Sequence, residues 1–110
     1  MKSMKDYCDN ETSRELKELG FPTKVTFIGE QATIEIPINS GWIHLYEAQK
    51  FLREEKQVEV VILSRGMIGA PYYFQVYTDD YLSIADRDYA SYEEALSEGI
   101  KEAVKILKEK

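Results

Sequence analysis

The apolar positions of residues 91–107 recur every three or four residues, which is the spacing of one face of an α-helix. Ser91 and Glu94 have the spacing of a capping box at the start of this segment. Acidic residues come early in it and lysines come late, as the helix dipole favours. The sequence therefore predicts a helix with one buried face, formed by Tyr92, Ala95, Leu96, Gly99, Ile100, Ala103, Val104 and Leu107.

Two shorter segments, 10–19 and 44–56, also carry apolar residues at helical spacing. Asp9 is placed to cap the first of them, and Gly20 can end it in a left-handed conformation. Pro22 then prevents the helix from continuing. The chain is expected to form three helices in all.

The segments between these helices alternate with the period of β-strands. Residues 24–28 and 32–38 are predicted to form a hairpin through a two-residue turn at Gly29-Glu30. Pro37 cannot donate a ladder hydrogen bond, so the second strand ends there or lies at an edge. Residues 58–64 are apolar on nearly both faces, which predicts a central strand.

Residues 72–78 and 81–85 complete the strand pattern. The predicted fold is α+β: a mainly antiparallel sheet of four to five strands with three helices, in the order α-ββ-α-ββ(β)-α. Two of the helices are expected to pack over one face of the sheet. Residues 1–8 are predicted to be a flexible N-terminal lead-in, and residues 9–110 a single domain, which suits a chain of 110 residues.

Charge narrows the possible partners. With 14 Lys and Arg against 20 Asp and Glu, the net charge is −6, and no basic cluster is visible. Nucleic-acid binding is not expected, because affinity for phosphate comes from Lys and Arg. One cysteine, Cys8, excludes an intramolecular disulfide, and His44 is the single histidine, so neither a metal site nor a cofactor is predicted. No apolar run approaches a membrane span, so no membrane partner is expected and the cytoplasm is the predicted location.

Four segments together resemble a known set of proteins: 11–21, 48–54, 72–74 and 92–96. In this order they resemble small uncharacterised, prophage-associated α+β proteins of Bacteroides-type gut bacteria. The resemblance implies a phage or mobile-element context. It implies no activity and no functional residues, because none is known for that set.

The aromatic strand at 72–78 supplies the main candidate contact surface. Period-2 alternation divides its residues between two faces. The more apolar set is expected to face the core: Tyr72, Phe74 and Val76. The other set then forms an outward stripe available to a partner protein: Tyr73, Gln75 and Tyr77. The alternative is that these aromatic side chains only fill the pleated surface, as strands favour.

The loop before this strand adds a second candidate. Gly66 and Gly69 flank Met67 and Ile68, two apolar residues at a loop tip where polar ones are usual. Exposed apolar residues of this kind suit a contact site. Met67 and Ile68 are therefore included in the predicted binding surface.

Catalytic motifs are not recognisable in the chain. His44 has no defined nucleophilic partner, and Cys8 is expected to be a small buried thiol. We predict a non-enzymatic protein-interaction module that binds a partner protein or forms a homodimer. Two alternatives stay open: a ligand-binding protein or enzyme whose pocket is assembled from scattered residues, and an acidic inhibitor that mimics DNA.

Overall fold

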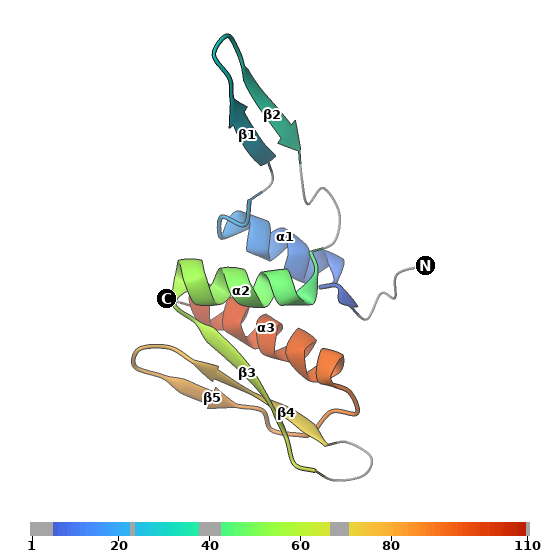
Figure 1. Ribbon diagram of the computed structural model, residues 1–110. Helices are drawn as coiled ribbons and strands as arrows, with labels where there is room; N and C mark the ends of the chain where they lie inside the picture. The colour runs from blue at the N-terminus through green and yellow to red at the C-terminus, as the bar shows by residue number, and fades with distance from the viewer. Residues whose placement is uncertain (1–5, 23, 38–42, 67–70, 110) are drawn as a thin grey trace.

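The computed structural model describes residues 6–22, 24–37, 43–66 and 71–109. Within them the chain is α+β with three helices, as predicted (Figure 1). In chain order the elements are α1 (Asn10–Glu18), β1 (Lys24–Ile28), β2 (Thr33–Pro37), α2 (Leu45–Lys56), β3 (Glu59–Ser64), β4 (Tyr72–Tyr77), β5 (Leu82–Ile84) and α3 (Tyr92–Lys108).

The strands form two sheets, where one sheet of four to five strands was predicted. In the part of the chain that the structure describes, β1 pairs with β2, and the other sheet has the antiparallel order β3-β4-β5. β3 is thus an edge strand, and its prediction as a central strand was wrong. Its apolar residues do lie on both faces, but the described helices all lie on one side of this sheet (Figure 1).

Two of the helix starts follow the sequence signals. Asp9 Oδ1 accepts a hydrogen bond of 2.8 Å from the Thr12 backbone N–H, and Ser91 Oγ accepts one of 3.1 Å from the Glu94 N–H. Each bond satisfies a donor that the first helical turn leaves unpaired. Gly20 has a φ of 106°, the left-handed conformation that was expected after the first helix.

α3 packs against the three-stranded sheet and supplies much of the core. Leu96 and Ile100 are fully buried. Between them Gly99 lets the helix backbone approach the sheet closely. A Cβ at Gly99 would lie 2.7 Å from Val60 Cγ1 and 3.1 Å from Phe74 Cβ. The glycine on the predicted helix face is therefore required by helix–sheet contact.

The predicted flexible lead-in, residues 1–8, differs from the structure at its end. Residues 6–8 are described, and Tyr7 forms an isolated antiparallel β-bridge with His44. The Cys8 N–H donates to the Ile43 carbonyl over 2.7 Å, and Cys8 is almost fully buried. These residues are held because the core covers the small apolar thiol.

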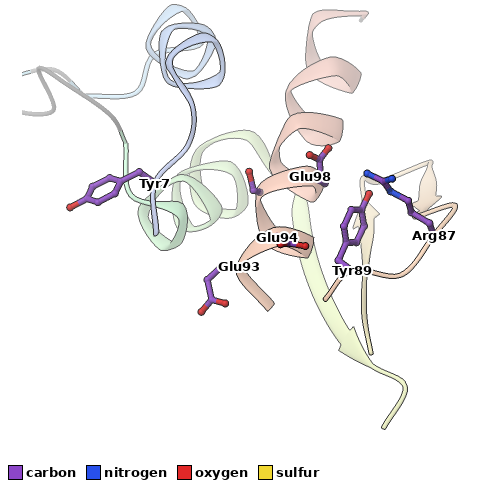
Figure 2. A pocket seen from close by; sticks show the side chains of 7 residues that line it. Tyr7, Arg87, Tyr89, Glu93, Glu94 and Glu98 are labelled. Atoms are coloured by element: carbon purple, nitrogen blue, oxygen red, sulfur yellow. The ribbon is translucent and has the colours of Figure 1, made fainter. Parts of the chain in front are cut away.

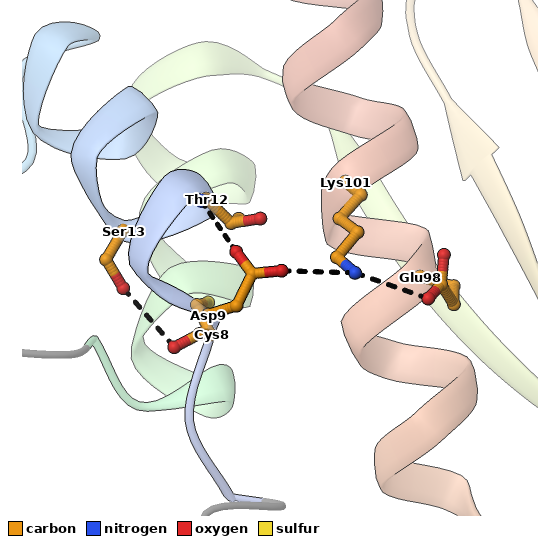
Figure 3. A network of polar contacts seen from close by, with 6 residues as sticks. All are labelled: Cys8, Asp9, Thr12, Ser13, Glu98 and Lys101. Carbon is orange, nitrogen blue, oxygen red and sulfur yellow. Dashed lines mark hydrogen bonds and ion pairs between the residues drawn. The ribbon is translucent and has the colours of Figure 1, made fainter.

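A polar network joins α1 to α3 (Figure 3). Lys101 Nζ lies 3.2 Å from Asp9 Oδ2 and 3.4 Å from Glu98 Oε1. On the other side of α1, the Ser13 hydroxyl donates to the Cys8 carbonyl over 3.4 Å. The network therefore fixes the start of α1 against the helix that covers the sheet.

The β1–β2 hairpin projects away from the rest of the molecule (Figure 1). The radius of gyration is 15.9 Å, above the value of about 13 Å expected for a compact chain of this length. The register of the ladder continues past Ile28 and Thr33, because the Gly29 N–H donates to the Ala32 carbonyl over 2.8 Å. This bond leaves two residues at the tip, Glu30 and Gln31, whereas the two-residue turn was predicted one position earlier, at Gly29-Glu30.

Candidate protein-interaction surface

The two faces of the three-stranded sheet have different surroundings. On the inner face, Val60 and Val76 are fully buried and Phe74 is 7% exposed. Tyr72 shares this face and is half-buried against the same core. The predicted orientation of β4, with Tyr72, Phe74 and Val76 towards the core, agrees with the structure.

The opposite face, which we name the outer face, follows from the strand register. Cross-strand partners share a face of an antiparallel sheet, and Tyr77 pairs with both Glu59 and Leu82. Seven of the positions on this face carry no charge. The outer face consists of Glu59, Val61, Leu63, Tyr73, Gln75, Tyr77, Leu82 and Ile84.

Several of these side chains are largely open to solvent. Tyr77 is 40% exposed, Leu82 48% and Ile84 53%. The Tyr77 hydroxyl is hydrogen-bonded to Gln75 Oε1 on the same face. Within the described residues, all three helices lie on the other side of this sheet (Figure 1). The outer face is therefore a mostly uncharged surface that the described chain leaves uncovered.

Tyr73, in contrast, is partly covered by Arg65. The Arg65 guanidinium carbon lies 4.1 Å from the centre of the Tyr73 ring, a cation–π distance. Arg65 Nε donates to Asp88 Oδ1 over 2.7 Å, and this hydrogen bond is the main reason that the pKa of Arg65 is raised. The ion pair between Arg65 and Asp88 thus holds one positive and one negative charge at the end of the outer face where Tyr73 lies.

The predicted site residues are thus only partly brought together. Tyr73, Gln75 and Tyr77 share the outer face. Met67 and Ile68 lie outside the described residues. Sequence reasoning missed the exposed apolar residues of β5, Leu82 and Ile84, although their alternation around Ser83 was a usable signal.

A separate hollow lies between the N-terminal segment, α3 and the segment before it (Figure 2). Its volume is about 350 Å³. Three carboxylates point from α3, and the Arg87 guanidinium lies 5.1 Å from the centre of the Tyr89 ring. His44 does not line it. The lining residues are Tyr7, Arg87, Tyr89, Glu93, Glu94, Ser97 and Glu98.

A row of aromatic rings crosses the end of the molecule where α2 and α3 begin. The row consists of Tyr7, His44, Tyr46, Tyr92 and Tyr72, with successive ring centres 5.3–6.3 Å apart. His44 also caps α2, because its Nδ1 accepts from the Tyr46 N–H over 3.2 Å. Desolvation, with the charge of Glu93 next, raises the pKa of Tyr46.

Features typical of catalysis or metal binding are weak in the described part of the chain. Burial, with the Asp9 charge second, raises the pKa of the Cys8 thiol to about 12, which opposes thiolate chemistry. Among the described residues no group of three or more His, Cys, Asp or Glu side chains could hold a metal ion. No helix in these ranges is long and apolar enough to cross a membrane.

Comparisons with known proteins add no functional information. No protein-family model, curated protein or solved structure matches this chain. The functional argument therefore rests on the geometry of the surface itself.

Proposed function

We propose that this chain is a non-enzymatic protein-interaction module that binds through the outer face of its three-stranded sheet. The observation that carries the proposal is the open face itself, where one of eight positions is charged although the chain has a net charge of −6. Depletion of charge and enrichment of tyrosine are typical of the centre of protein interfaces. Exposed apolar surfaces of this kind mark sites of association.

The geometry of β4 and β5 supports this use of the face. Tyr77 is hydrogen-bonded to Gln75, and a tyrosine side chain offers a large contact area at a low cost in conformational entropy. Tyr77, Leu82 and Ile84 lie on two paired strands and together present apolar area on a rigid support. A partner with a matching apolar patch would bury that area, and such burial drives most protein association.

The alternative functions have less support. The hollow beside Tyr7 holds carboxylates, Arg87 and Ser97, but within the described residues no hydrogen bond joins Ser97 to a carboxylate that could act as its base. A DNA mimic would present rows of carboxylates, whereas the outer face carries only Glu59. The phage or mobile-element context implied by the resemblance is part of the proposal, and the comparisons do not test it.

Paired tyrosine substitutions test the proposal. Tyr73→Ser with Tyr77→Ser should leave the fold intact, because neither ring is buried in the core. The double variant should lose at least tenfold in affinity for whatever the wild type binds, since interface tyrosines often dominate binding energy. Light scattering of the purified protein and capture from a bacterial extract, compared between variants, measure the loss.

A matched control removes another exposed tyrosine. Tyr46→Ser deletes a ring that is 47% exposed and lies at the start of α2, off the outer face. This variant should associate as the wild type does. If the control loses association while the Tyr73/Tyr77 variant keeps it, the aromatic row at the start of α2 is the contact surface and the proposal is wrong.

A further inference from the structure

The two edges of the three-stranded sheet are not equally available for pairing. The backbone N–H of Arg65 donates to the Pro71 carbonyl over 2.7 Å. In an antiparallel pair every second residue directs its N–H and C=O groups to the partner strand, so this bond determines which residues of β3 face β4. By that alternation, Val60 and Ile62 direct their backbone groups away from β4. The Val60 carbonyl is already used, because Gln49 Nε2 of α2 donates to it over 2.7 Å. α2 therefore closes part of the β3 edge.

The β5 edge has no such cover. The Ala85 N–H donates to the Phe74 carbonyl over 3.0 Å, and the Thr78 N–H donates to the Tyr81 carbonyl over 2.8 Å. With this alternation the backbone groups of Ser83 point to β4, while those of Leu82 and Ile84 point away. Within the described residues no strand pairs with that side of β5. Unpaired apolar edges of this kind template the addition of another strand.

We propose that the partner of this edge is a second copy of the chain, paired antiparallel through β5 about a two-fold axis at Ser83. This inference goes beyond the proposed function, because the pairing uses the edge of the sheet and leaves the outer face open to a partner. In that register Leu82 of one copy lies opposite Ile84 of the other. Each such pair exchanges both of its N–H···O=C bonds, because both residues direct these groups outward. The edge is therefore complementary to itself, as a two-fold interface requires.

The side chains favour this occupant. Leu82 and Ile84 are about half exposed and lie on the outer face, so the pairing places each leucine beside an isoleucine of the other copy and joins the two outer faces into one continuous apolar surface. The strand itself carries no charge. Acidic residues flank it, and the register places Asp80 of one copy opposite Asp86 of the other. Charge therefore opposes the dimer, which should strengthen as salt screens the repulsion.

Backbone amide exchange, followed by NMR at rising protein concentration, tests the pairing directly. The amides of Leu82 and Ile84 should become protected, by at least tenfold, as the dimer forms. The Ser83 amide is the internal control, because it bonds to β4 in the monomer and should be protected at every concentration. Sedimentation equilibrium should show a monomer–dimer equilibrium, a weak one since the strand has three residues.

Two proline variants locate the edge. Ile84→Pro removes a donor that points away from β4, so it should abolish the dimer and keep the fold. Ser64→Pro places the same change at the exposed end of the β3 edge and should leave the dimer intact. Leu82→Lys, at a half-exposed position, should also give a folded monomer, and it provides a second test if the proline disturbs β5.

The outcomes separate this inference from the proposed function. A wild type that stays monomeric, or an Ile84→Pro variant that is folded and still dimeric, overturns the β5 pairing. Protection of Leu82 and Ile84 that develops only with a captured protein also overturns it, because the edge then binds another chain. In each of these cases the experiment with Tyr73→Ser and Tyr77→Ser can still support or contradict binding through the outer face.

Discussion

The three-stranded sheet and the β1–β2 hairpin are both antiparallel and both arise from alternating apolar residues, but their surroundings differ. α3 and α2 pack against β3, and α3 also packs against β4. The hairpin strands pair with each other and project from the molecule (Figure 1). A lone two-stranded hairpin is marginal in water, whereas three strands packed on a helix can be stable. The comparison indicates that the helices, more than the strands, determine which part of the chain is stable.

This difference predicts two levels of stability within one chain. The body formed by the helices and the three-stranded sheet should unfold as a unit. The hairpin should open at a lower free energy, because the described backbone of β1 and β2 contacts mainly the paired strand. Three experiments break or sharpen this comparison.

The largest effect should come from the buried face of α3. Leu96→Ala and Ile100→Ala each remove a fully buried side chain, at a cost of about 2–5 kcal/mol apiece. A domain of this size has only about 5–15 kcal/mol of stability. The double variant should therefore be largely unfolded at 37 °C in a circular-dichroism melt.

The control for that experiment lies on the other side of the same sheet. Val61→Ala shortens a half-buried side chain on the outer face and should cost much less. A double variant of α3 that melts close to the wild type would show that this helix does not hold the sheet together.

A smaller effect should come from acid acting on the contact between α1 and α3. Partial desolvation acts to raise the pKa of Asp9, but hydrogen bonds from Thr12 and Lys101 outweigh it and hold the pKa below its ordinary value of 3.8. The carboxylate thus stabilises the fold above pH 3.8, and this contribution is lost as the pH falls through the lower folded pKa.

Because Asp9 is half exposed, the contribution should be about 0.2–1 kcal/mol. Asp9→Asn should remove it, so urea melts of variant and wild type should differ at pH 6 and converge near pH 2. A difference that stays constant across this range would mean that the charge of Asp9 does not stabilise α1.

Local signals predicted the helices well. Asp9, Gly20 and Ser91 act at helix ends through bonds within a few residues, so the sequence pattern contains all the information needed. The alternation along β4 also predicted which of its residues face the core. Phe74 and Val76 are buried because apolar period-2 positions must pack on something, and α3 is the adjacent amphipathic element.

Long-range pairing was the part that sequence reasoning could not supply. The apolar residues on both faces of β3 predicted a strand covered on both sides, but Val61 and Leu63 lie on the outer face, which the described chain leaves open. Alternation cannot tell an apolar face that the same chain covers from one that is open to a partner. The assignment of β1 and β2 to a separate sheet depends on the same missing information.

The smallest effect should come from the hairpin, which provides the final test of the comparison. Replacing residues 24–37 with a short Gly-Ser turn removes strands whose main contacts are with each other. The melting temperature of the body should change by less than about 3 °C, since a change of 1 kcal/mol shifts a domain of this size by about 4–8 °C. In the intact chain, hairpin amides should exchange with solvent much faster than those of β4.

If the replacement lowers the melting temperature by 10 °C or more, or if the hairpin amides are as protected as those of β4, the hairpin packs against another surface in solution. The division of the chain into a stable body and a weakly held hairpin would then be wrong.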